Sequence, residues 1–115
     1  MRGHEPVAGT AVVKLPTEVD IGNADHVGEQ LRAAAAPGVM VVVADLTTTK
    51  FCDSAGVRQL ALAHDKVADS GAQLRLAVAE GGSVDRILAL IGLEQLVPQY
   101  PTVEAALAAP PERAP

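Results

Sequence analysis

The side chains that could do chemistry gather in one short stretch, Cys52-Asp53-Ser54. A serine nucleophile needs a general base within hydrogen-bond reach. His64 lies ten residues further along the same predicted helix, about 15 Å away at a rise of about 1.5 Å per residue. The G-x-S-x-G pattern of a nucleophile elbow is also missing, because Cys52 stands two residues before Ser54. The spacing therefore argues against catalysis by Ser54 and leaves three roles for it: a modification site, a contact residue or an ordinary helix cap.

The thiol and the carboxylates near Ser54 favour structural roles. A carboxylate beside a thiol disfavours the thiolate, so we expect Cys52 to be a small buried residue. Asp20, Asp45 and Asp53 could converge on one sheet edge, which would suit a metal ion or a phospho-aspartate site of the receiver kind. A receiver needs an acidic pair after its first strand and a lysine after a late strand, and the sequence has neither. We therefore expect loop carboxylates that cap turns and helices, with no metal and no cofactor.

The elements that position Ser54 follow from the spacing of apolar residues. Residues 39–44 are six consecutive apolar residues rich in Val, which predicts a strand covered on both faces. The next helix begins near Asp53 or Ser54, both good N-cap types. His64 falls on the apolar stripe of this helix, where we expect a partly buried histidine with its hydrogen bonds satisfied. Glycine costs about 1 kcal/mol relative to alanine in a helix, so Gly56 either leaves room for the surface of a partner or is incidental to the helix start.

The rest of the chain alternates predicted strands with predicted helices. Short turns between them imply βαβ crossovers and a largely parallel or mixed sheet. The strand over 72–79 alternates apolar with polar residues, which predicts burial mainly on one face. We expect one domain over residues 1–109, a disordered tail over 110–115, and either a frayed start or a short edge strand through residues 6–8. The predicted strands are 10–15, 39–44, 72–79 and a short one from 96, and the predicted helices lie within 24–35, 53–68, 83–91 and 102–107.

Composition limits the class of partner. The 115 residues include one Phe, one Tyr and no Trp, so the core must be built from aliphatic residues and a base-stacking surface is missing. The net charge is −5 and the nine basic residues are scattered, so we expect no nucleic-acid partner. A single cysteine excludes an intramolecular disulfide, and no apolar stretch resembles a signal peptide or approaches the roughly 18 residues of a membrane span. These features indicate a cytoplasmic protein without a membrane anchor.

The segment around Ser54 resembles the phospho-acceptor segment of STAS domains, specifically that of the bacterial anti-sigma factor antagonists, or anti-anti-sigma factors. The family pattern is an apolar strand, D-L-[ST], a short spacer, then [FY]-x-D-S-[STA]-G and a helix; this chain has VVVADLTTTKFCDSAGVRQL. Glu18-Val19-Asp20 also resembles the family's E-[LIV]-D, and Ile91-Gly92-Leu93 resembles its late [LIM]-[ST]-G-L turn. The resemblance covers about Thr10 to Leu107. Thr17, Lys50 and Gly92 depart from the pattern, and the first two lie near the expected docking surface.

The resemblance implies a regulatory role rather than an enzymatic one. In that family the serine after the aspartate is phosphorylated by an anti-sigma factor that is also a serine kinase, and the matching residue is Ser54. The unphosphorylated protein binds the anti-sigma factor and frees its sigma factor for transcription, phosphorylation releases the partner, and a metal-dependent serine phosphatase resets the cycle. The implied fold is a small α/β sandwich, with a four- to five-stranded mixed sheet and about four helices mostly on one face. The expected partner-binding residues are Asp20, Asp45, Asp53, Ser54, Ala55 and Gly56.

Two alternatives to this switching antagonist stay open. The chain could be a non-switching STAS interaction domain of a larger signalling complex. Less favoured is a nucleotide-responsive module or an enzyme that uses the Asp53-Ser54 edge as its site.

Overall fold

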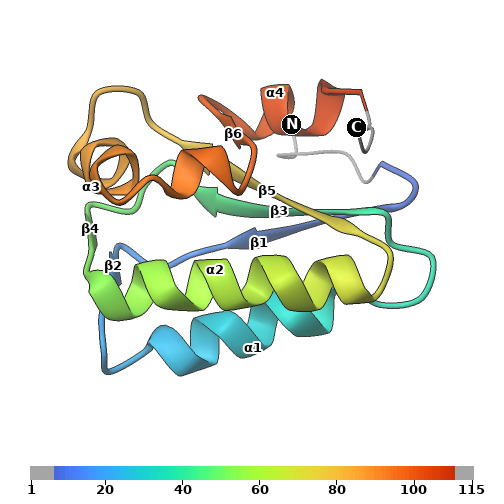
Figure 1. Ribbon diagram of the computed structural model, residues 1–115. Coiled ribbons are helices and arrows are strands. Elements are labelled where there is room, and N and C mark those ends of the chain that lie inside the picture. Colours follow the sequence, from blue (N-terminus) through green and yellow to red (C-terminus); the bar gives the residue numbers. More distant parts are fainter. Residues whose placement is uncertain (1–6, 111–115) are drawn as a thin grey trace.

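The computed structural model describes residues 7–110, which form two parallel sheets and four α-helices (Figure 1). The larger sheet has the strand order β1-β3-β5-β6, and the smaller sheet pairs β2 with β4. The predicted α/β class is confirmed, and each strand pair within residues 7–110 is parallel. The elements are β1 (Thr10–Lys14), β2 (Glu18–Val19), α1 (Ala24–Ala34), β3 (Val41–Leu46), β4 (Phe51–Cys52), α2 (Ser54–Asp69), β5 (Gln73–Val78), α3 (Ser83–Ile91), β6 (Gln99–Tyr100) and α4 (Val103–Ala108).

Strand β3 lies in the middle of the larger sheet because its side chains are apolar on both faces. It is hydrogen-bonded to β1 on one side and to β5 on the other. Val42, Val43 and Ala44 are fully buried. The strand begins two residues later than the predicted range of 39–44 and runs on to Leu46, so it includes Asp45.

The helices cover the two faces of the larger sheet unequally. Helices α1 and α2 lie side by side over one face, and α4 lies over the opposite face (Figure 1). Helix α3 adds Val84 and Leu88 to the larger core, which it shares with α1 and α2. The prediction of helices mostly on one face is therefore confirmed, with α4 as the exception. The smaller core under α4 consists of Val43, Ala77, Val103 and Ala106.

The cover that α4 provides changes the environment of β5. The sequence pattern predicted a strand buried mainly on one face, yet Arg75 and Ala77 on the other face are also buried. The Arg75 guanidinium donates hydrogen bonds to the carbonyl oxygens of Ala106 and Ala109, at 2.6 and 2.9 Å. The prediction of a one-sided strand is wrong because a helix 30 residues later in the chain covers the polar face, which local periodicity cannot reveal.

The last strand also differs from its prediction. The sequence predicts a start at Leu96, but β6 begins at Gln99, between Pro98 and Pro101. Gly92 does close α3 in the left-handed conformation, with a φ of 88°. A 3-10 turn over Leu93–Gln95 then follows, so the chain is still turning at Leu96 and becomes extended only beyond Val97.

The first described residues form a turn rather than a strand. The backbone N–H of Thr10 donates to the carbonyl oxygen of Val7 at 3.0 Å. An edge strand through Val7 and Ala8 is therefore absent, and Pro6 lies outside the described residues. The predicted disordered tail, apart from Pro110, also lies outside them.

Candidate functional site

The acceptor candidate Ser54 is the first residue of α2, and Asp53 caps the helix. Asp53 has an extended backbone, and its Oδ1 accepts a hydrogen bond from the backbone N–H of Gly56 at 3.0 Å. This bond satisfies one of the N–H groups that a helix start leaves unpaired. The predicted helix start and cap are confirmed. Asp53 therefore positions Ser54 by fixing the helix start, since its carboxylate bonds to Gly56 and not to the serine hydroxyl.

The small sheet of β2 and β4 places this helix start beside the first loop of the domain. In the parallel register Glu18 pairs with Phe51 and Val19 pairs with Cys52. The backbone N–H of Asp53 then donates to the carbonyl oxygen of Val19 at 3.1 Å. Two segments more than 30 residues apart in sequence are thereby joined directly in front of Ser54. Phe51 and Cys52 were not predicted as a strand, because a strand of two residues has no periodicity.

The Ser54 side chain is exposed, and its hydroxyl makes no hydrogen bond to residues 7–110. Catalysis by Ser54 has no support in the geometry, since His64 lies ten residues along the same helix. His64 is half-buried, and its Nδ1 has no hydrogen-bond partner in the described part of the chain. The expectation that this histidine is fully satisfied is therefore wrong. Ser54 is accessible to another molecule, and His64 is too far along the helix to serve it as a base.

Gly56 faces the protein rather than a partner. It is buried, and a Cβ atom at this position would lie 2.6 Å from Cys52 Sγ and 2.8 Å from Val19 Cγ1. Real Cβ atoms essentially never approach another atom so closely. The interpretation that Gly56 leaves room for a partner is therefore corrected: its missing side chain lets α2 pack against β2 and β4.

Cys52 is a structural residue, as expected. Its side chain is 5% exposed and belongs to the larger core. Burial raises the pKa of the Cys52 thiol to about 11, and the neighbouring Asp53 carboxylate adds to the effect. The thiol is consequently protonated at neutral pH and is a poor nucleophile.

Only two of the three predicted acidic residues meet at this edge. Asp20 follows β2 and Asp53 follows β4, so the parallel pairing brings them together. Asp45 instead lies within β3, 9% exposed, on the face that Val43 presents to α4. Its Oδ1 accepts hydrogen bonds from the backbone N–H and the hydroxyl of Thr47, at 2.9 and 2.6 Å. The three carboxylates that could have converged therefore do not all meet here; each accepts a hydrogen bond from a backbone N–H of its own turn or helix start, as expected. Residues 7–110 contain no group of three side chains arranged to hold a metal ion.

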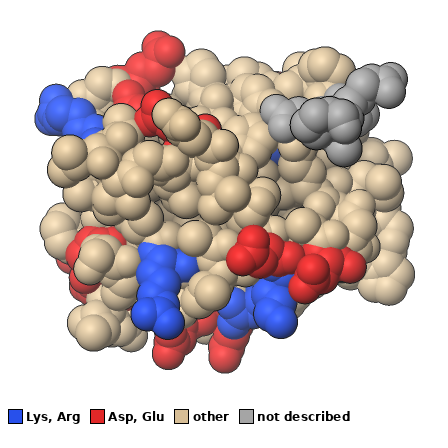
Figure 2. Space-filling model, in the orientation of Figure 1, with Lys and Arg blue, Asp and Glu red and all other residues tan. Residues whose placement is uncertain are grey.

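Charge is mixed over the face of the molecule seen in Figure 2. Acidic and basic side chains alternate over the part of the surface formed by α1 and α2, the middle of the face is mostly uncharged, and charges of both signs appear again at its upper left. This face therefore lacks the continuous positive surface that nucleic-acid binding requires.

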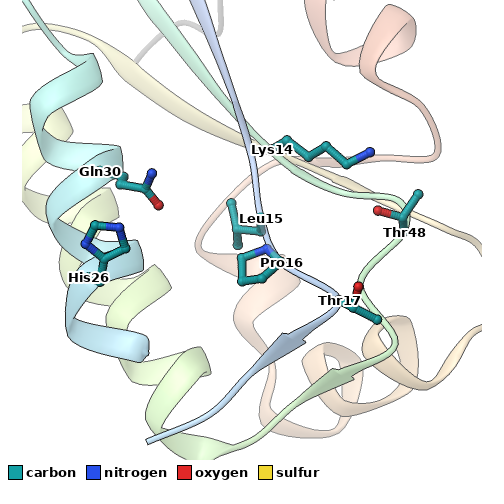
Figure 3. Close-up of a pocket in the computed structure, with 7 residues that line it drawn as sticks. All are labelled: Lys14, Leu15, Pro16, Thr17, His26, Gln30 and Thr48. Atoms are coloured by element: carbon teal, nitrogen blue, oxygen red, sulfur yellow. The ribbon is translucent and has the colours of Figure 1, made fainter. Parts of the chain in front are cut away.

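An open pocket of about 440 Å³ lies beside the end of β1. Figure 3 shows His26 and Gln30 of α1 facing Leu15 and Pro16, while the Lys14 side chain extends away from the helix. None of the predicted site residues lines this pocket, and its walls bring together no pair of groups suited to acid–base chemistry. The remaining lining residues are Thr17 and Thr48.

Two exposed apolar side chains at the edge that carries Ser54 were not predicted from the sequence. Ile21 is 84% exposed and Phe51 is 49% exposed. The signal for Phe51 was present in principle, because strand alternation with a buried Cys52 turns the preceding side chain outward. It could be used only after β4 was recognised as a strand.

Comparisons with known proteins agree with this architecture. The anti-sigma-F factor antagonist RsfB of Mycobacterium tuberculosis is 29% identical over 100 residues, which cover 86% of this chain and 80% of that protein. The structure of an anti-sigma factor antagonist from Mycobacterium paratuberculosis superposes with a TM-score of 0.76 at 27% identity, covering 90% of this chain and 86% of that one. The unphosphorylated antagonist SpoIIAA shares the fold, with a TM-score of 0.69 at 19% identity and 90% coverage of both chains.

Within residues 7–110, each helix is too short or too polar to cross a membrane. Residues 2–106, nearly the whole chain, match the STAS domain family. The order of elements, the capped helix start with its exposed serine and this match lead to one conclusion: the chain belongs to the STAS domain family.

Proposed function

We propose that this protein is a cytoplasmic anti-sigma factor antagonist that is switched at Ser54. The unphosphorylated protein binds an anti-sigma factor and so frees a sigma factor for transcription. The anti-sigma factor is a serine kinase that phosphorylates Ser54 and is thereby released, and a metal-dependent serine phosphatase restores the hydroxyl. The similarity to antagonists over most of the chain supports the class of protein.

The observation that carries the proposal is the state of the three serine hydroxyls in the chain. The hydroxyl of Ser70 donates to the carbonyl oxygen of Val67 at 2.7 Å, and that of Ser83 donates to the carbonyl oxygen of Lys50 at 2.6 Å. Ser54 is exposed and makes no such bond within residues 7–110. A kinase can therefore approach the Ser54 hydroxyl without first breaking a contact of the fold.

The position of Ser54 lets a phosphate change binding without unfolding the protein. A phosphoserine adds about −1.5 to −2 charges, and a helix N-terminus favours a nearby anion by about 0.3 to 1 kcal/mol. The start of α2 should therefore persist after phosphorylation. The partner would instead meet added bulk and charge beside Asp20 and Asp53. A hundredfold loss of affinity requires only about 2.8 kcal/mol.

Titration of the native anti-sigma factor with two variants tests the proposal. We expect Ser54→Ala to bind as the wild type does but to resist release, because it keeps a small neutral side chain that cannot accept phosphate. We expect Ser54→Asp to bind more weakly, because it places a charge at the helix start. The matched control is Ser70→Asp, which puts the same group at the other end of α2 and should bind like the wild type. Equal binding by Ser54→Ala and Ser54→Asp would contradict the switch.

A further inference from the structure

The chain's one phenylalanine lies outside the core. Cys52 and Val19 turn inward from the two strands of the small sheet, with 5% and 1% of their surfaces exposed. Because side chains alternate along a strand, their neighbours Phe51 and Glu18 face outward, opposite each other in the register. Phe51 therefore has nearly half of its surface in water, while the cores are filled by aliphatic residues with one buried cysteine.

A second large apolar side chain is presented by the loop after β2. Ile21 is 84% exposed, yet the backbone around it is held in place. Oδ1 of Asp20 accepts from the N–H of Gly22 at 2.9 Å, and the backbone N–H of Asp20 donates to Asn23 Oδ1 at 2.9 Å. The Asn23 amide also donates to the carbonyl oxygen of Glu18 at 2.8 Å. Ile21 thus projects from a loop that is already ordered, which lowers the entropy cost of using it in an interface.

Both side chains lie at the edge that carries Ser54. Phe51 is three residues before the serine, and the hydrogen bond from Asp53 to Val19 joins its strand to the segment that leads into Ile21. Figure 1 shows β2, β4 and the beginning of α2 together at one end of the molecule. Exposed Lys50 beside Phe51 also gives this edge a basic group next to its carboxylates. The edge therefore combines two apolar projections with a polar rim of both charges.

We propose that the side chains of Phe51 and Ile21 insert into the partner protein that phosphorylates Ser54. These two contacts provide most of the binding free energy, and the phosphorylation state of Ser54 decides whether the partner binds. This inference rests on the proposed function and commits to one occupant, an anti-sigma factor with an apolar recess beside the site that receives the serine hydroxyl. Aromatic side chains buried at the centre of an interface, with polar groups around them, commonly carry most of the binding free energy. Phe51 lies three residues before Ser54, so one partner surface can contact both residues.

Alanine substitution combined with calorimetric titration separates affinity from switching. We expect Phe51→Ala to weaken binding of the unphosphorylated protein to the native anti-sigma factor by at least about thirtyfold. We expect Ile21→Ala to weaken it by about tenfold, and Phe51→Leu to retain part of what Phe51→Ala loses. The matched control is Met40→Ala. Met40 is 62% exposed but precedes β3, at the opposite end of the strands from Ser54, so its loss should leave the affinity unchanged.

The outcomes distinguish this inference from the function on which it rests. If the wild type binds and Phe51→Ala binds equally well, the assignment of Phe51 to this interface is wrong and the antagonist function stands. If the wild type does not bind its native anti-sigma factor, the proposed function fails and the inference falls with it. Sedimentation of the wild type alone gives a third outcome: a dimer that Phe51→Ala dissociates would make a second copy the occupant and overturn the assignment. Thermal unfolding of each variant checks that a loss of binding is not a loss of fold.

Discussion

Two polar side chains, Arg75 and Ser54, are held in opposite ways at two places in this molecule. Arg75 is 1% exposed on the face covered by α4, and its guanidinium is surrounded by acceptors. It donates to the carbonyl oxygens of Ala106, Ala109 and Pro110 and to Gln73 Oε1, over 2.6 to 3.1 Å. Ser54 is exposed at the start of α2 and has no partner for its hydroxyl within residues 7–110.

The difference separates a group that maintains the fold from a group that is available to another protein. A charge taken out of water must find compensating hydrogen bonds, so the conformation of Arg75 is tied to the position of α4. Helix α4 has only six residues, which is too few to be stable alone. Arg75 donates hydrogen bonds to carbonyl groups that the C-terminal end of α4 leaves unpaired. The ring of Tyr100, 5.9 Å from the guanidinium carbon, adds a cation–π contact. The exposed hydroxyl of Ser54 can hydrogen-bond to water, so the fold does not have to provide a partner for it.

The largest effect on stability should come from removing the buried cation. Arg75→Met fills a similar volume but leaves the buried carbonyl oxygen of Ala106 without its donor, and a buried unsatisfied group costs about 1 to 3 kcal/mol. We expect the free energy of unfolding to fall by about 3 kcal/mol, measured by urea denaturation. Arg58→Met, at an exposed position of α2, is the matched control and should change it by less than about 0.5 kcal/mol. Similar losses in both variants would mean that Arg75 does not hold α4 in place.

A smaller effect should come from the buried glycine beneath the acceptor. In Gly56→Ala the new methyl group must displace Cys52 or Val19, and overpacking of this kind costs about 1 to 3 kcal/mol. The higher helix propensity of alanine returns about 1 kcal/mol, so we expect a net destabilisation of about 1 kcal/mol. The control is Gly82→Ala, whose Cβ would meet only the Ala79 carbonyl oxygen at an ordinary 3.6 Å. If Gly56→Ala raised the thermal unfolding temperature, the space between α2 and the strands β2 and β4 would be large enough for a methyl group.

The thiol next to this edge should react as an interior group. With its pKa raised from 9.0 to about 11 by burial and by Asp53, Cys52 has about one hundredth of the thiolate of a free thiol at pH 8. We expect an aromatic disulfide reagent to modify the folded protein at least a hundredfold more slowly than the protein unfolded in urea. Equal rates of modification in the folded and unfolded protein would mean that the folded protein exposes Cys52 to solvent.

The same raised pKa gives a pH dependence of stability. Between about pH 9 and pH 11 the unfolded chain has lost the Cys52 proton while the folded chain keeps it, so the unfolded state binds fewer protons. The contribution of this thiol to stability is therefore fully present below about pH 9 and is lost as the pH rises through about 11. The control is Cys52→Ala. Its free energy of unfolding should lack the decrease between about pH 9 and pH 11 that Cys52 causes in the wild type.

The sequence predicted the features that depend on neighbouring residues. The cap at Asp53 and the start of α2 follow from an Asp-Ser pair before a helical apolar pattern, and the central strand follows from its run of valines. The pairing of β2 with β4 escaped prediction, because two-residue strands have no period and their partners are more than 30 residues apart. The structural roles of Gly56 and Arg75 also depend on residues far away in the sequence. Gly56 packs against Val19, and Arg75 donates hydrogen bonds to α4. The role of Ser54 as an acceptor stays a prediction.

The most direct test of that role compares two forms of one preparation of the wild-type protein, unmodified and phosphorylated at Ser54, in titrations against the native anti-sigma factor. Mass analysis first establishes that the phosphate is on Ser54 and not on the hydrogen-bonded Ser70 or Ser83. We expect phosphorylation to weaken binding by about a hundredfold or more, equivalent to about 2.8 kcal/mol, while the thermal unfolding of the domain is nearly unchanged. Equal affinity of the two forms would show that Ser54 is not the switch.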